Sequence, residues 1–270
     1  MGMIHVRKKR TAALHGARAL LALALLLVLP ASSFAIGEFS LGMNLGFTYG
    51  PNGVDDTVNR FNTGMENYKS ANAGTKMEQL SAPYCPVFGV SARYQFNYFL
   101  FRFGWHYTQP VLPIEGYITP AGGGAKNKIR ITTYQNSLPA TIGIIMPLKK
   151  RTYFYLGAGG TLHHAYVKIT QKAPDQAVPV FNMSTNVGVS DNKVDRYSGM
   201  FVAYHLILGA EVPVSEKVTI TTEWIHQEGM SYPLKNQGID NADAATADPK
   251  RNINVRGDVL LFGVSYYIHI

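Results

Sequence analysis

Residues 98–109 read YFLFRFGWHYTQ, and this stretch decides the fold. Every second position is aromatic: Phe99, Phe101, Phe103, Trp105 and Tyr107. The intervening positions are mostly polar or small: Leu100, Arg102, Gly104, His106 and Thr108. A period of two predicts a strand with one apolar face and one polar face. Five consecutive aromatic residues suit a face in contact with lipid better than the largely aliphatic core of a soluble sandwich.

The N-terminus has the pattern of a secretory signal peptide. Basic residues 7–10 and Arg18 precede an apolar run of 11 residues, 19–29, and small residues end at Ala35. A membrane-spanning helix needs about 20 apolar residues, so the run is too short to be one. We therefore expect cleavage near Ala35, with residues 36–270 forming one domain.

Charge content argues against a nucleic-acid-binding protein, and cysteine content argues against a lipoprotein. The first 35 residues carry 5 of the 25 basic residues and no acidic ones, which leaves 20 basic against 17 acidic. This small excess gives no reason to expect nucleic acid as a partner. Cys85 is the only cysteine, so no disulfide can form within the chain, and no lipid-acceptor cysteine follows Ala35.

Eight segments alternate with period two and predict an all-β, eight-stranded antiparallel up-and-down transmembrane barrel. They are residues 36–50, 84–96, 98–109, 131–146, 152–170, 196–212, 218–227 and 259–270. The upper part of the fourth segment switches parity, which suggests either a bulge or emergence from the membrane. Long and short connections alternate, as expected for four extracellular loops and three periplasmic turns. A soluble lipocalin-like barrel is the alternative, but its narrow interior would not hold so many aromatic side chains.

Three stretches carry a resemblance to the OmpW family of small outer-membrane barrels. They are Leu138-Pro139-Ala140-Thr141, residues 153–159 (YFYLGAG) and residues 258–266. OmpA-like and OmpX-like barrels are near alternatives. The resemblance implies passage of small apolar molecules through an apolar constriction and out sideways into the membrane. The end of the chain also resembles the final-strand signal for the barrel-assembly machinery, although it ends in Ile270 and not in Phe.

Inward parity places two groups of residues in the lumen. Low in the barrel we expect a charge cluster in which the arginines pair with the glutamates: Glu38, Arg93, Arg102 and Glu211. Such a cluster commonly serves only to fill a small barrel. Higher up we expect an apolar constriction: Val87, Phe201, Ile225, Val259 and Leu261. Ordinary packing of the interior is its alternative explanation.

No pattern in the sequence predicts catalysis, a metal or a cofactor. His106, His163 and His205 share inward parity, but no carboxylate or cysteine spacing supports a metal site, so we interpret them as hydrogen-bonding groups of the lumen. His226 has serines nearby without a defined Ser-His-acid arrangement. We therefore expect no enzyme and no cofactor.

The first long loop contains an amphipathic pattern. Apolar residues recur at spacings of four and three: Val54, Val58, Phe61, Met65 and Tyr68. This spacing predicts a helix within residues 54–69, with its apolar stripe over the barrel mouth or against the loop around residues 178–181. A disordered loop is the alternative, because Gly64 and three asparagines lower helix propensity.

Two functions follow from these patterns. The first is an outer-membrane channel or binding protein for small apolar solutes. The second is a surface adhesin that uses its extracellular loops, which make up close to half of the residues after Ala35, to bind host surface molecules. In both cases the expected partners include outer-membrane lipid and, during biogenesis, the barrel-assembly machinery.

Overall fold

The computed structural model describes residues 37–49, 54–81, 84–123, 126–149, 152–172, 180–181, 188–189, 193–229, 232–239, 250–253 and 256–269. The predicted signal peptide, residues 1–35, lies outside these ranges. Among the described residues, no helix combines the length and the apolarity that crossing a membrane requires.

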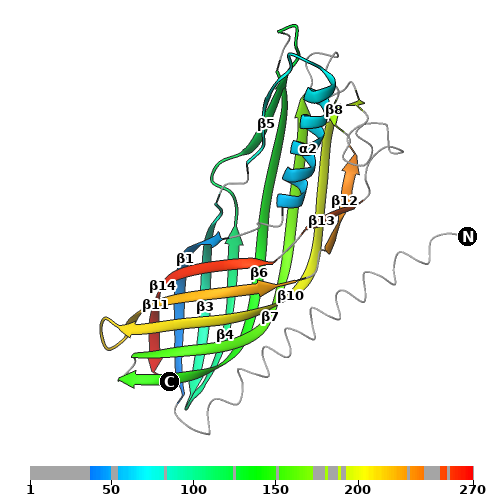
Figure 1. The fold of residues 1–270 in the computed structure, drawn as a ribbon. Helices are drawn as coiled ribbons and strands as arrows, with labels where there is room; N and C mark the ends of the chain where they lie inside the picture. The colour runs from blue at the N-terminus through cyan, green and yellow to red at the C-terminus, as the bar shows by residue number, and fades with distance from the viewer. Residues whose placement is uncertain are drawn as a thin grey trace, which may run out of the picture.

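Eight antiparallel strands form a closed ring (Figure 1). Strands that are neighbours along the chain pair with each other, and β1 closes the ring by pairing with β14. The strands are β1 (Glu38–Tyr49), β3 (Pro86–Phe96), β4 (Phe99–Thr108), β6 (Asn127–Lys149), β7 (Thr152–Lys172), β10 (Lys193–Pro213), β11 (Val218–Glu228) and β14 (Gly257–His269). The predicted eight-stranded barrel is confirmed.

The outward face of the ring is apolar, and its inward face holds the buried polar side chains. Large exposed hydrophobic residues occur around the ring, among them Met43, Phe103, Ile142, Leu206 and Val264. At these positions the predicted outward parity is confirmed. The turn between β3 and β4 is also as tight as expected, because Asn97, with a φ of 53°, and Tyr98 alone connect the two strands.

Three strands rise well beyond the rest of the ring and form a tall wall on one side of the mouth (Figure 1). β6 has 23 residues and β7 and β10 have 21 each, whereas β1 has 12. Short strands that the sequence pattern did not predict widen this wall or lie near it. They are β2 (Lys76–Glu78), β5 (Ile114–Thr119), β12 (Tyr232–Ile239), β13 (Lys250–Ile253) and the separate pair β8 (Val180–Phe181) and β9 (Gly188–Val189).

The parity switch expected in β6 does not come from a bulge, because the upper part of the strand continues in the same register above the rest of the ring (Figure 1). β6 and β7 pair in one continuous register from Lys128 to Pro147. Buried side chains stay on the same parity throughout, from Ile129 and Ile131 down to Ile145. The apolar residues therefore shift from the outward face of β6 to its inward face, whereas the same parity faces inward along the whole strand. Low in β6 they face outward, and high in β6 they face inward, where a helix covers them.

That helix is α2, Asp55–Ala71, and it packs along the inner side of the tall wall (Figure 1). Its stripe of Val54, Val58, Phe61 and Met65 is buried, with Met65 at 0 % exposure, and Tyr68 is partly buried. The predicted helix is therefore confirmed, although it ends at Ala71 and not within residues 54–69. Of the expected contact around residues 178–181, residues 178 and 179 lie outside the described part of the chain.

Candidate functional site

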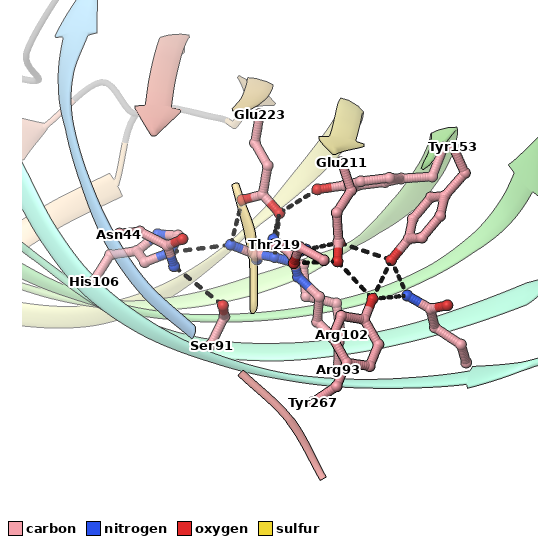
Figure 2. A network of polar contacts seen from close by, with 12 residues as sticks. Asn44, Ser91, Arg93, Arg102, His106, Tyr153, Glu211, Thr219, Glu223 and Tyr267 are labelled. Carbon is pink, nitrogen blue, oxygen red and sulfur yellow. Dashed lines mark hydrogen bonds and ion pairs between the residues drawn. The ribbon is translucent and has the colours of Figure 1, made fainter. Parts of the chain in front are cut away.

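A network of buried ion pairs fills the lower lumen (Figure 2). Arg93 on β3 lies between two carboxylates: its Nη1 is 2.7 Å from Glu211 Oε2 on β10, and its Nη2 is 2.6 Å from Glu223 Oε1 on β11. Arg102 on β4 reaches Glu223 Oε2 at 2.7 Å. All four side chains are at most 1 % exposed. The network thus joins four strands across the barrel.

Hydroxyl groups donate further hydrogen bonds to these two carboxylates. Tyr267 and Thr219 each donate to Glu211 Oε1 at 2.5 Å. Tyr153 donates to Glu211 Oε2 at 2.7 Å, and Tyr155 donates to Glu223 Oε1 at 2.5 Å. Buried charges are tolerated where such hydrogen bonds replace lost hydration. The lower lumen is therefore closed by packed and hydrogen-bonded side chains.

The sequence alone predicted only part of this network. It paired both arginines with Glu38 and Glu211, and the structure joins Arg93 to Glu211. The pairing of Arg102 was wrong, because its carboxylate partner is Glu223. Glu38 is half-buried at the start of β1, in register with Gln95. The alternation of β11, with Ile220 and Trp224 outward, already placed Glu223 inward and was the signal that could have identified it.

The three inward histidines lie above the ion pairs, and all are buried. His106 Nε2 is 3.3 Å from Arg102 Nη2. His163 Nδ1 is 2.9 Å from Ser137 Oγ. His205 is held on both sides, by Thr141 at 2.7 Å and Thr161 at 2.8 Å. Each ring thus contacts polar neighbours in the lumen.

The described residues contain no cluster of three or more metal-ligating side chains. The remaining histidine singled out by the sequence, His226, is half-buried on the outward face of β11. Its Nδ1 lies 2.8 Å from Asp258 Oδ1, and its Nε2 lies 3.4 Å from Glu228 Oε2. Both ring nitrogens therefore face carboxylates.

The five residues of the expected apolar constriction are all buried, but they do not form one ring. Phe201 belongs to an upper apolar cluster with the stripe of α2. Val87, Ile225, Val259 and Leu261 belong to a lower cluster, together with Tyr153, Tyr155 and Ile207. The prediction of a single constriction was therefore wrong, because its five residues are divided between two clusters. The reason is that β10 rises into the wall, so Phe201 lies under the helix.

The upper apolar cluster joins α2 to the inner face of the wall. Its strand residues come from five neighbouring strands: Ile114 and Ile118 of β5, Ile129 and Ile131 of β6, Ala165, Val167 and Ile169 of β7, Tyr197, Phe201 and Ala203 of β10, and Leu234 of β12. The segment after the helix is also fixed, because Asn62 accepts from the Leu80 N–H at 2.8 Å and donates to the Leu80 carbonyl at 2.9 Å. The helix thus covers the apolar inner face of the wall.

The β4–β6 ladder has an interruption near the level of the histidines. Phe103 pairs with Ala140 and His106 pairs with Ser137, but the positions between them do not pair across these strands. In this register Gly104 lies opposite Pro139, which has no N–H to donate. On their other side Gly104 and Trp105 remain paired with β3, to Ser91 and Val90. We call this interruption of the β4–β6 ladder the seam; beside it, Trp105 Nε1 donates a hydrogen bond to Asn136 Oδ1 on β6 at 3.2 Å.

The fold is similar to several solved outer-membrane proteins. OprG from Pseudomonas aeruginosa has 11% identity and a TM-score of 0.44, with 87% of this chain and 97% of that chain covered. A major outer membrane protein from Thermus thermophilus has 10% identity and a TM-score of 0.44, with coverage of 86% and 99%. Neisserial surface protein A has 12% identity and a TM-score of 0.43, with coverage of 84% and 96%.

No curated protein matches the chain. Residues 21–267 match a family described as "Outer membrane protein beta-barrel domain". The match spans most of the 270 residues and includes all eight strands of the ring except the last residues of β14. The chain therefore belongs to the family of outer membrane protein beta-barrel domains.

Proposed function

We propose that this outer-membrane barrel takes up small apolar molecules from the extracellular side and releases them sideways into the membrane between β4 and β6. The observation that carries the proposal is the interruption of the β4–β6 ladder at Gly104 and Trp105, opposite Pro139 and Leu138. Apolar solutes are the class for which such an exit is useful, because they are stable in the hydrocarbon core into which the seam opens.

The closed lower lumen supports a lateral exit over an axial one. A solute that continued straight down would have to separate the buried pairs of Arg93 and Arg102 with Glu211 and Glu223. Breaking a buried ion pair costs about 3–5 kcal/mol where one charge is left without a partner. The seam lies above these pairs, since His106, at its upper edge, is four residues beyond Arg102 on the same strand.

The upper apolar cluster supports the proposal that the solutes are apolar. The inner wall beneath α2 is lined by aliphatic and aromatic side chains, and α2 is attached to this wall through its apolar stripe. Displacing the helix exposes a surface on which apolar molecules gain free energy, about 25 cal/mol for each Å² removed from water. The helix is thus a gate over the receiving surface.

A reversible cross-link across the seam tests this route. Trp105→Cys with Leu138→Cys places two outward-facing thiols on opposite sides of the seam, at positions that the flanking register sets opposite each other. Uptake of radiolabelled naphthalene is measured in cells that produce the protein, oxidised and then reduced. We expect uptake to fall to the level of cells without the protein on oxidation and to recover on reduction.

The matched control is Phe103→Cys with Ala140→Cys, two residues lower on each strand, where β4 and β6 are paired. Oxidation of this pair is expected to leave uptake unchanged. If the seam cross-link leaves uptake unchanged as well, the lateral route is wrong. If cells with and without the protein take up naphthalene equally, the transport function is wrong, and the adhesin interpretation of the loops becomes the better one.

A further inference from the structure

The outward face of the tall wall is strongly basic, although its inward face is apolar. Among the described outward-facing residues of β5, β6, β7 and β10 above the membrane level, Glu115 is the only acid. The bases on the same face number five, and we call them the basic face: Lys128, Arg130, Lys168, Lys172 and Arg196. By contrast, the exposed side of α2 mixes signs, with Arg60, Glu66 and Lys69. The basic face is therefore a distinct feature of the wall.

Like charges lie directly opposite one another on this face. Lys128 on β6 pairs in register with Lys172 on β7, and Lys168 on β7 pairs with Arg196 on β10. Like charges in directly opposed positions destabilise a sheet. Glu115 offsets part of this repulsion, since its carboxylate contacts Lys128 at 2.7 Å and also pairs with Arg130. No ion pair among the described residues involves Lys168 or Lys172, so no neighbouring carboxylate offsets the positive charge of these two lysines.

A row of aromatic residues locates the basic face relative to the membrane. Trp105, Tyr107, Tyr134 and Tyr166 stack side by side across β4, β6 and β7, with ring centroids 4.9 to 6.3 Å apart. Aromatic rows of this kind lie at the membrane–water interface of outer-membrane barrels. Lys168 is two residues beyond Tyr166 on the same strand, a rise of about 7 Å, and Lys172 is about 20 Å beyond it. The basic face thus begins at headgroup level and continues outward.

We propose that the basic face binds the phosphate groups of phosphorylated glycolipids in the outer leaflet of the membrane. Lysine and arginine side chains bind phosphate through charge-assisted hydrogen bonds. Phosphates at Lys168 and at Lys172 supply the opposite charge that Glu115 already supplies to Lys128 and Arg130. The continuity with the aromatic row favours a lipid over a soluble anion, because acyl chains of a bound lipid then lie against the apolar belt below. This surface is separate from the lumen, and the proposal does not depend on solute uptake.

The test is a binding titration with the full chain folded in zwitterionic detergent. Fluorescent lipid A with two phosphates is the probe, and its dephosphorylated form is the comparison. Each Lys or Arg near an anionic lipid surface changes affinity by about fivefold. We expect Lys168→Gln with Lys172→Gln to weaken binding of the phosphorylated form by about 25-fold, and to leave binding of the dephosphorylated form unchanged.

Two further variants control the interpretation. Lys69→Gln with Lys217→Gln removes two exposed lysines elsewhere, on α2 and in the turn before β11, and is expected to change affinity by less than twofold. Glu115→Gln removes the acid that pairs with Lys128 and Arg130 and is expected to tighten binding about fivefold. Heat-modifiable migration on gels checks that each variant is folded. Equal affinity of the wild type for both lipid forms, equal losses in both double variants, or strong binding of heparin without phosphate-dependent lipid binding would overturn the proposal.

Discussion

Arg102 contacts both oxygens of Glu223: its Nη2 lies 2.7 Å from Oε2, and its Nε lies 3.0 Å from Oε1. Oε1 also receives Arg93 Nη2 at 2.6 Å and the Tyr155 hydroxyl at 2.5 Å. One carboxylate on β11 thus holds two arginines from β3 and β4 on the opposite side of the lumen. Because its partners come from distant parts of the chain, Glu223 is the residue on which closure of the lower barrel most depends.

Removing that carboxylate is expected to weaken the barrel strongly. Glu223→Gln leaves Arg93 and Arg102 with one buried carboxylate between them, and loss of a buried partner costs about 3–5 kcal/mol. The free energy of unfolding is measured by urea titration in lipid vesicles. Glu216→Gln, in the exposed turn before β11, is the matched control and is expected to change it by less than about 0.5 kcal/mol. Equal stabilities of the two variants would contradict this role of Glu223.

Glu115 lies outside the membrane-spanning part of the barrel, and its ion pairs predict the pH at which its carboxyl group is protonated. Burial raises the pKa of the Glu115 carboxyl, but hydrogen bonds from Lys128, Tyr117 and Arg130 outweigh burial and lower it from 4.5 to about 2. A lowered pKa in the folded state means that the stabilisation is complete above about pH 4.5 and is lost as the pH falls toward 2. We expect the Glu115 side-chain ¹³C signal in NMR spectra to remain that of a carboxylate at pH 3.5. A midpoint near 4.5 would contradict the pairing.

The sequence predicted the eight ring strands because the two faces of each strand meet different surroundings. It also predicted α2, because the Val54 to Met65 stripe has helical spacing. It did not predict β5, where Gly116 interrupts the inward apolar pattern of Ile114 and Ile118. It assigned the wrong partner to Arg102, because parity gives the direction of a side chain but not which strand faces it across the lumen. That relation depends on the stagger of all eight strands.

Shortening one side chain of the α2 stripe is expected to release the helix without unfolding the ring. Phe61→Ala removes a side chain that is 1 % exposed, and such a change costs about 3–5 kcal/mol at a well-packed site. The barrel strands do not depend on α2 for their pairing. Limited proteolysis of the protein in vesicles is expected to cut within residues 54–81 at least tenfold faster than in the wild type.

The neighbouring Arg60→Ala is the control for this experiment, since Arg60 is exposed on the same helical turn. It is expected to leave the rate of cleavage unchanged, and both variants are expected to keep heat-modifiable migration. If Phe61→Ala is cut no faster than Arg60→Ala, the apolar stripe does not hold the helix on the wall.

The division of the expected constriction into two clusters separates two substitutions that the sequence treated alike. The sequence places both residues in one expected constriction, so from the sequence alone Phe201→Asp and Leu261→Asp predict the same result: passage of apolar solutes is abolished and the barrel stays folded. Leu261 is in register with Glu223, and both side chains face the lumen. An aspartate at position 261 therefore adds a negative charge beside Glu223 within the closed lower barrel, and Leu261→Asp is expected to destabilise the fold by several kcal/mol.

Phe201 lies in the upper cluster, in register with His163 and away from the ion pairs. Its ring stacks on that of His163 at 5.1 Å. Phe201→Asp places a charge on the receiving surface. Covering this carboxylate with an apolar solute costs its hydration, so the solute binds less well, but the ion pairs below are not disturbed. We expect it to abolish naphthalene uptake while the urea midpoint in vesicles falls less than for Leu261→Asp. Full uptake by folded Phe201→Asp would show that solutes do not pass beneath α2.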